Sequence, residues 1–199
     1  MLTQTQQQIL TLLIEHQDSD FSIRQIARSL GKSYTLTYHN IQKLCDMDII
    51  KKAPVPPAQI IRIQEENSTN ILIDIERQRA SKFFEKNKEI ALYAQDVLKA
   101  APHPFFAMLI FGSYAKGTQT KKSDLDLLII TPRNEDIAAI EAATRQPTKT
   151  KKNIIVVTSE DFLGMIRNEK SFNVGNESRK HHIIIHNAES YYQLLRRDT

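Results

Sequence analysis

Two aspartates that lie two residues apart are the part of the sequence best suited to chemistry. Asp124 and Asp126 stand at the start of the apolar run Leu125–Ile130. Alternate residues of a strand point to the same face, so the two carboxylates would lie side by side and repel each other. A divalent cation relieves this repulsion, and Mg²⁺ prefers hard oxygen ligands of this kind. The spacing therefore predicts a magnesium site.

A Gly-Ser turn precedes the aspartates. Gly112 and Ser113 follow the apolar segment Phe105–Phe111, which is typical of a strand covered on both faces. Backbone N–H groups and a hydroxyl at such a turn suit phosphate oxygens, and a helix starting there would point its positive dipole end at them. Lys116 is placed to pair with a triphosphate. Metal-binding carboxylates beside a phosphate site indicate phosphoryl or nucleotidyl transfer.

The combined pattern resembles the signature of the minimal nucleotidyltransferases of the DNA polymerase beta superfamily. It consists of Gly112-Ser113, three residues, Gly117, five residues and Ser123-Asp124-x-Asp126. The resemblance covers residues 104–199 and implies transfer of a nucleoside monophosphate from an NTP to a hydroxyl of a protein, an RNA or a small molecule. It implies that Asp124 and Asp126 are catalytic and hold Mg²⁺, and that Gly112, Ser113 and Lys116 bind the nucleotide.

One position departs from the superfamily pattern. Members usually carry a third carboxylate on the strand that corresponds to residues 153–158, and the best match in this sequence is Asn153. An amide oxygen can bind a metal ion, but it carries no charge and cannot act as a base. This difference favours nucleotide binding with one Mg²⁺ over fast turnover.

The first 64 residues predict three helices followed by two short strands. The helices cover residues 3–16, 22–31 and 33–48, and the strands flank a proline-rich tip at residues 53–58. This order resembles a winged helix-turn-helix domain, whose third helix would lie in the major groove of double-stranded DNA. The residues expected to contact bases or phosphates are Arg24, Arg28, Ser33, Tyr34, Thr35, Tyr38, His39, Gln42, Lys43, Lys51 and Lys52.

The charge of this first part leaves a second interpretation open. Residues 1–66 contain seven basic and seven acidic residues, and no arginine stands at the start of the third helix, where a guanine contact would be easiest. The alternative is a winged helix that contacts protein. The whole chain carries a net charge of +4, which is compatible with polyphosphate or nucleic acid.

A long helix is expected over residues 71–99, between the two parts. An apolar seam follows it at spacings of three and four, which suits either a homodimer or packing on the transferase-like domain. The seam residues are Ala80, Phe83, Asn87, Ile90, Ala94 and Val97. The predicted fold is α+β, with a winged helix-turn-helix at residues 1–66, a linker or dimerisation helix at 67–103, and a mixed-sheet nucleotidyltransferase domain at 104–199.

The remaining composition indicates a cytoplasmic protein that does not associate with membranes. Cys45 is the single cysteine, so no disulfide within the chain is expected. The N-terminus lacks the pattern of a signal peptide, and no apolar run is long enough to cross a bilayer. His181, His182 and His186 have no acidic or cysteine partner at metal-ligand spacing, so a zinc site is not expected there.

Two functions of other classes stay open beside the enzyme. Asn153 together with the helix-turn-helix is compatible with a DNA-binding transcriptional regulator whose degenerate transferase domain senses a nucleotide. The third alternative is an antitoxin-like partner that modifies or masks another protein.

Overall fold

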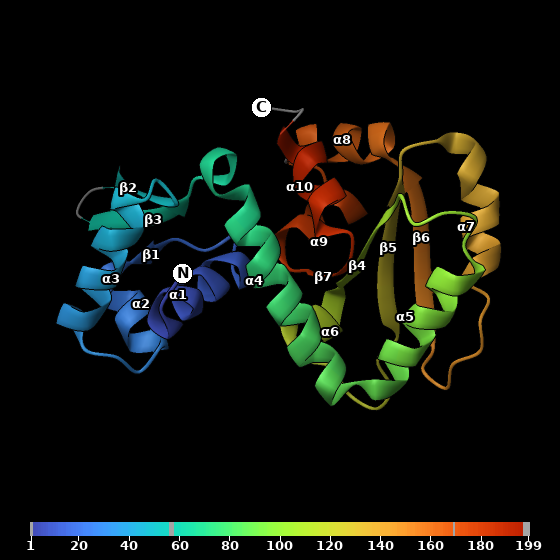
Figure 1. The fold of residues 1–199 in the computed structure, drawn as a ribbon, viewed down its shortest axis with the longest axis horizontal. Helices are drawn as coiled ribbons and strands as arrows, with labels where there is room; N and C mark the ends of the chain where they lie inside the picture. The colour runs from blue at the N-terminus through green and yellow to red at the C-terminus, as the bar shows by residue number, and fades with distance from the viewer. Residues whose placement is uncertain (1, 56–57, 169, 197–199) are drawn as a thin grey trace. The chain divides into compact units, whose positions relative to one another are not determined.

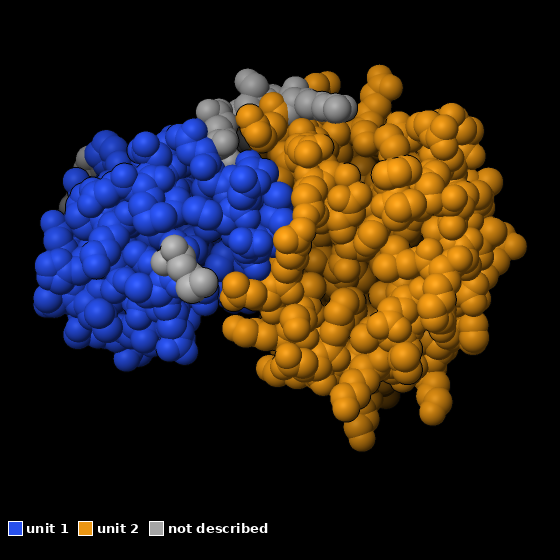
Figure 2. Space-filling model, viewed as in Figure 1, with its two compact units in different colours: residues 1–75 blue, residues 76–199 orange. Residues whose placement is uncertain are grey.

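The computed structural model describes residues 2–55, 58–168 and 170–196, and the chain divides into two compact units. Unit 1 comprises residues 1–75 and unit 2 comprises residues 76–199 (Figure 2). The domain limits expected after residues 66 and 103 stay predictions. Among the described helices, none combines the length and apolarity that crossing a bilayer requires.

Unit 1 contains three helices followed by a hairpin, as the sequence predicts (Figure 1). Its strands form one antiparallel sheet in the order β1-β3-β2. The tip of the hairpin, residues 56 and 57, lies outside the described residues. The elements are α1 (Gln4–Glu15), β1 (Phe21–Ser22), α2 (Ile23–Ser29), α3 (Tyr34–Asp46), β2 (Ile50–Val55) and β3 (Ala58–Ile63).

Local signals fix the helices of unit 1. Thr3 and Ser22 each accept a hydrogen bond from the backbone of the third helical residue, and that residue's glutamine side chain accepts one from the cap backbone in return. Gly31, with φ of 61°, ends the turn after α2 in the left-handed region. Thr37 and Ile41 of α3 are fully buried, so the opposite side of this helix faces outward.

Unit 2 is built on a four-stranded mixed sheet in the order β6-β5-β4-β7. β4 pairs antiparallel with both β5 and β7, whereas β5 and β6 are parallel. The strands are β4 (Ala107–Phe111), β5 (Leu125–Thr131), β6 (Lys152–Thr158) and β7 (Ile183–His186). The helices are α4 (Glu65–Lys86, beginning in unit 1), α5 (Lys88–Ala100), α6 (Gly112–Lys116), α7 (Ile137–Ala143, after the 3-10 turn Asn134–Asp136), α8 (Ser159–Arg167), α9 (Val174–Lys180) and α10 (Ala188–Arg196).

The sheet is buried on both faces, because the two sets of alternating side chains meet different helices (Figure 1). Leu125, Leu127 and Ile129 of β5 belong to one apolar cluster with residues of α4, α5 and α7. Leu128 and Ile130 point to the other face. Asp126 shares their face by the same alternation, which places its carboxylate away from the cluster. The mixed α+β fold predicted from the sequence is confirmed.

The single long helix predicted over residues 71–99 is wrong. The chain breaks at Asn87, whose φ of −128° and ψ of 60° are not helical, and its side-chain amide donates to the Phe83 carbonyl over 2.8 Å. The break turns the chain so that both halves of the apolar seam pack into the core of unit 2. Phe83, Ile90 and Val97 are buried there. In this structure the apolar seam residues therefore belong to the core of unit 2, which agrees with packing on the transferase-like domain.

Candidate functional site

The candidate site is centred on Asp126, the second residue of β5. Asp126 stands opposite Phe111 at the end of β4 and beside Asn153 on β6. The Asn153 amide Nδ2 donates a hydrogen bond of 3.2 Å to Asp126 Oδ1. The position expected to carry the third carboxylate thus does lie beside Asp126, and the residue there is a neutral donor.

The backbone at Gly112 leaves no room for a side chain beside the other oxygen of the same carboxylate. Its φ is 66°, and a Cβ atom added to it would lie 2.3 Å from Asp126 Oδ2. Real Cβ atoms do not approach an oxygen this closely, so only glycine fits without moving the aspartate. The turn at Gly112 and the Asp126 carboxylate therefore face each other.

The other predicted nucleotide and metal residues lie in the segment between these two positions. Asp124 is exposed and stands one residue before β5 begins. Ser113 is half-buried in α6, and its carbonyl accepts the Thr118 N–H over 3.0 Å. Lys116 is exposed at the last position of α6. A helix does begin at the Gly-Ser turn, but α6 has only five residues, so its dipole is weak.

Magnesium binding at this site stays a prediction. Asp124 and Asp126 would supply carboxylate oxygens, and the Asn153 amide would offer an oxygen if it turned about its Cβ–Cγ bond. Over the part of the chain that the structure describes, no group of three or more His, Cys, Asp or Glu residues is arranged to hold a metal ion. Two carboxylates and one amide would hold one Mg²⁺ more readily than two.

The strand that carries Asn153 is anchored at its beginning by α5 and by the loop before β6. Glu89 accepts hydrogen bonds from Thr148 Oγ1 and from the backbone N–H groups of residues 149 and 150. These bonds, with that from Thr148 the largest contribution, lower the pKa of Glu89. Lys152 Nζ donates to two carbonyls of the same loop and lies 4.3 Å from the centre of the Tyr93 ring. Burial lowers the pKa of Lys152.

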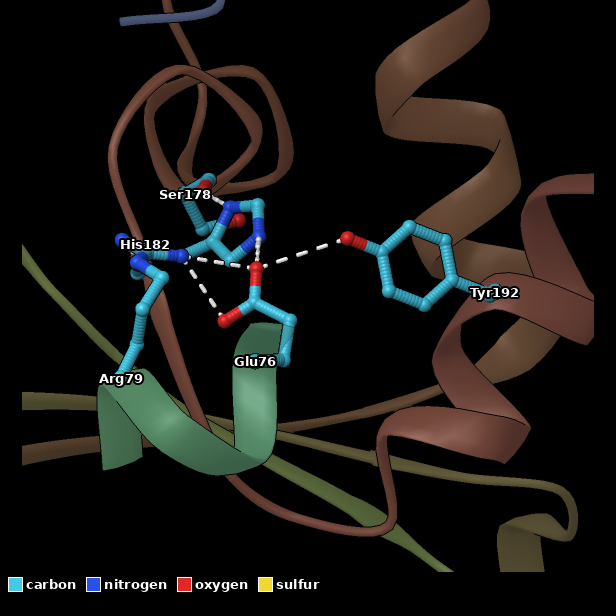
Figure 3. Close-up of polar contacts among 5 residues, drawn as sticks. All are labelled: Glu76, Arg79, Ser178, His182 and Tyr192. Carbon is cyan, nitrogen blue, oxygen red and sulfur yellow. Dashed lines mark hydrogen bonds and ion pairs between the residues drawn. The ribbon is translucent and has the colours of Figure 1, made fainter. Parts of the chain in front are cut away.

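A buried polar cluster lies elsewhere in unit 2 (Figure 3). Both carboxylate oxygens of Glu76 accept hydrogen bonds from Arg79 Nη1, at 2.7 and 2.8 Å. Glu76 Oε1 is also 3.4 Å from His182 Nε2 and 3.4 Å from the Tyr192 hydroxyl. Burial alone would raise the pKa of Glu76, but Arg79, His182 and the Ile184 backbone N–H outweigh burial and lower it.

This cluster joins α4 to the segment that leads into β7. Arg79 Nη2 donates to the His182 carbonyl over 2.6 Å, and the His182 ring nitrogen Nδ1 lies 2.8 Å from the Ser178 carbonyl. Sequence analysis missed Glu76 as the partner of His182, because 106 positions separate the two residues and local spacing carries no sign of the contact. The cluster is a structural ion pair with satisfied acceptors and does not touch Asp126.

The residues predicted to contact DNA divide into outward-facing and engaged side chains. The outward-facing side chains, all of them exposed, are Arg24, Arg28, Ser33, Tyr34, Thr35, Tyr38, His39, Lys43 and Lys51. Ser33 also caps α3 by accepting the Leu36 N–H over 3.3 Å. Gln42 and Lys52 are half-buried and bonded to each other, with Lys52 Nζ 2.8 Å from Gln42 Oε1.

Leu36 is a residue of this surface that sequence analysis overlooked. Its side chain is 45% exposed, comparable to Tyr34 at 52% and Tyr38 at 39%. An apolar residue in a helical pattern is normally assigned to the core, and Leu36 stands one turn before the buried Asn40, at the edge of the buried side. Helical spacing alone therefore gave no clear sign of its exposure.

Comparison with known proteins finds both parts of the chain. Residues 95–192 match the family model described as "Nucleotidyltransferase domain", and residues 2–51 match the one described as "Winged helix-turn-helix DNA-binding". The two matches confirm the combination of domains predicted from the sequence.

No curated protein matches the chain. Two solved structures of MepR from Staphylococcus aureus are similar at 18% identity and a TM-score of 0.33, over 49% of this chain and 78% of theirs. One is a mutant from a multidrug-resistant clinical isolate, and the other is described as a transcription regulator of the multidrug efflux pump MepA. A TM-score of this size supports no conclusion about this chain.

Proposed function

Because this chain joins a winged helix-turn-helix DNA-binding domain to a nucleotidyltransferase domain, we propose that it binds duplex DNA through α3 and an NTP at Asp126. The reaction proposed is transfer of a nucleoside monophosphate to a hydroxyl group of a protein, an RNA or a small molecule. The observation that supports it best is the approach of the Gly112 backbone to the Asp126 carboxylate.

Each residue of the site has a distinct proposed part. Asp124 and Asp126 would hold Mg²⁺, which when bound would neutralise phosphate oxygens of the NTP. The backbone N–H groups at Gly112 and Ser113 and the Ser113 hydroxyl would bind the β- and γ-phosphates, and Lys116 would pair with their charge. The turn and the carboxylates would thus place the α-phosphorus next to the acceptor.

The balance of the proposed step is simple. The acceptor oxygen attacks the α-phosphorus, the bond from this phosphorus to the oxygen that bridges to the β-phosphate breaks, and pyrophosphate leaves. The hydroxyl proton passes to solvent, because the Asn153 amide cannot accept it. The lack of a base at this position predicts slow transfer.

Label transfer from an α-³²P-labelled NTP tests the enzyme proposal. We expect labelled protein, RNA or small molecule with the wild type and Mg²⁺, and at least a hundredfold less with Asp126→Asn. Asp96→Asn, which removes an exposed carboxylate on α5, is the matched control and should label like the wild type. Equal labelling by Asp126→Asn and the wild type would refute the role of this carboxylate.

A second function is favoured by Asn153 specifically. In a regulator that senses a nucleotide, the neutral Asn153 beside Asp126 would allow NTP binding without turnover. Calorimetry with each NTP and Mg²⁺ distinguishes the two functions when combined with Asn153→Asp. Binding without transfer in the wild type, with transfer gained in Asn153→Asp, would support the regulator; transfer by the wild type would support the enzyme.

A further inference from the structure

We infer that the first two turns of α3 recognise thymine methyl groups, so that the DNA site of this protein is rich in A·T base pairs. The inference rests on the proposed DNA binding and adds the kind of sequence that is bound. The N-terminal residues of a recognition helix are those that reach base edges in the major groove. The side chains exposed there decide which base edges can be recognised.

The exposed side chains at the start of α3 are unusually apolar. Tyr34, Leu36 and Tyr38 are 52%, 45% and 39% exposed. The rings of Tyr34 and Tyr38 stack with their centres 6.2 Å apart and their planes 26° apart. Leu36 is two positions from each tyrosine and therefore lies on the other flank of the helix, and Thr35, between the two flanks, adds a methyl group and a hydroxyl. In the major groove, the C5 methyl group of thymine is the base feature that such apolar surfaces match.

The groups that would recognise guanine are missing from this part of the helix. α3 contains no arginine, and its one lysine, Lys43, stands at the tenth of thirteen positions. Guanine is recognised most often by two hydrogen bonds from an arginine or lysine to O6 and N7. The first two turns offer no arginine or lysine, and the exposed ring of His39 cannot present two parallel donors to O6 and N7, so guanine lacks its usual paired contact there.

The glutamine that could recognise adenine is already engaged. Gln42 Nε2 donates to Asp46 Oδ1 over 2.9 Å, and Gln42 Oε1 accepts from Lys52 Nζ over 2.8 Å. Lys52 Nζ also lies 5.1 Å from the centre of the Tyr38 ring. Both ends of the amide that would pair with adenine N6 and N7 are therefore occupied. Specificity is left to apolar contacts, to the hydroxyl groups of Tyr34, Thr35 and Tyr38, and to the ring of His39.

Basic side chains on the elements next to α3 fit the same orientation. The last turn of α3 carries both Lys43 and Asp46, both exposed, whose opposite charges offset each other. Further exposed basic residues lie on α2 and the hairpin, at Arg24, Arg28 and Lys51. The beginning of α3 can thus approach the bases, while neighbouring elements supply the phosphate contacts.

The test starts with selection from a random pool of duplex DNA by the full chain at low salt. We expect the selected sites to be rich in A·T pairs. Binding is then compared between the selected duplex and the same duplex with deoxyuridine in place of thymidine, which lacks only the C5 methyl group. We expect about tenfold weaker binding to the deoxyuridine duplex.

Two variants assign this difference to α3. Leu36→Ala should reduce the thymidine-to-deoxyuridine affinity ratio severalfold toward one. Met47→Ala, which shortens a side chain that is 50% exposed just after the same helix, should leave the ratio unchanged. Thermal unfolding of both variants checks that unit 1 remains folded.

The outcomes separate this inference from the proposed function. Sites rich in G·C pairs, or an affinity ratio near one in the wild type, would overturn the thymine inference and leave DNA binding intact. Absence of any duplex binding at low salt would overturn both, and would point to α3 as a surface for protein. An affinity ratio that Leu36→Ala leaves unchanged would overturn the assignment to α3.

Discussion

At the scale of single residues, the candidate site depends on how close the chain at Gly112 comes to Asp126. The residue types and their spacing could be predicted from the sequence, because Gly-Ser turns and paired aspartates are local patterns. The direct approach of Gly112 to Asp126, and the bond from Asn153, could not be predicted in detail. They arise from the register of three strands, and register depends on packing across the whole sheet.

Substitution of Gly112 by alanine should abolish nucleotide binding, whereas the same change at Gly117 should not. Both glycines have φ near 66°, at 66° and 67°, so both variants should lose about 1–2 kcal/mol of stability through backbone strain. Only at Gly112 would the new Cβ lie 2.3 Å from Asp126 Oδ2, whereas nothing lies within 4 Å at Gly117. Denaturant unfolding and NTP calorimetry on the two variants measure the two effects separately, and equal nucleotide affinities would contradict the site geometry.

Substitution of Glu76 by glutamine should destabilise the protein strongly. The buried Arg79 guanidinium would lose its counter-charge, and breaking a buried ion pair costs about 3–5 kcal/mol. Glu85→Gln is the matched control, because Glu85 is an exposed acid on the same helix and its loss should change stability by less than about 0.5 kcal/mol. Urea unfolding at pH 7 checks both values; similar losses would show that Arg79 does not depend on Glu76.

The same variant predicts a change in the pH dependence of stability. Burial would raise the pKa of Glu76 in the folded chain, but Arg79 and His182 outweigh burial and lower this pKa. The carboxylate therefore contributes its stability in full above its unfolded pKa of about 4.3 and loses it as the pH falls below that value. Between pH 5 and pH 3, Glu76→Gln should lose less stability than the wild type. Parallel curves in urea unfolding would contradict this.

At the scale of elements, helix beginnings were easier to predict than helix interruptions. Ser22 and Ser33 could be recognised as caps, because a side chain oxygen and the helix it caps are adjacent in sequence. The break at Asn87 was missed, since its cause is the burial of Phe83 on one side and Ile90 on the other side of the turn. Burial of this kind is decided by the sheet that both helices cover.

Removal of the Ser22 cap should destabilise unit 1 measurably. Ser22 Oγ accepts the Gln25 N–H over 3.4 Å and donates to Gln25 Oε1 over 2.7 Å, so Ser22→Ala leaves a helix N–H without its acceptor. The expected loss is about 1 kcal/mol. Ser19→Ala, at an exposed serine that precedes the strand β1, should cost less than about 0.5 kcal/mol. Denaturant unfolding of the two variants gives the comparison, and equal stabilities would exclude a role for the cap.

At the scale of the whole molecule, two compact units are joined through α4, which begins in unit 1 and continues into unit 2. If the proposed nucleotide and DNA sites communicate, their coupling must be reciprocal. If an NTP changes the dissociation constant of DNA by some factor, DNA must change the dissociation constant of the NTP by the same factor.

This reciprocity provides a test of coupling between the units. In the wild type we expect NTP with Mg²⁺ to change DNA affinity between fivefold and a hundredfold, the usual range for coupled sites. In Asp126→Asn the DNA affinity without nucleotide should equal that of the wild type, and the effect of NTP should vanish. Fluorescence anisotropy with labelled duplex measures both. A nucleotide effect that persists in the variant would place the sensing site elsewhere.

The ion pair of Glu76 and Arg79 has one more consequence. β7 is the last strand of its sheet, and backbone groups at the free edge of such a strand can recruit a strand from another molecule. Glu76 accepts a hydrogen bond from the Ile184 N–H, and Arg79 donates one to the His182 carbonyl. Two side chains of α4 thus occupy backbone groups to which a strand of another molecule would have to bond. A variant that lacks these two side chains should aggregate through the isoleucine-rich edge of β7 before it unfolds.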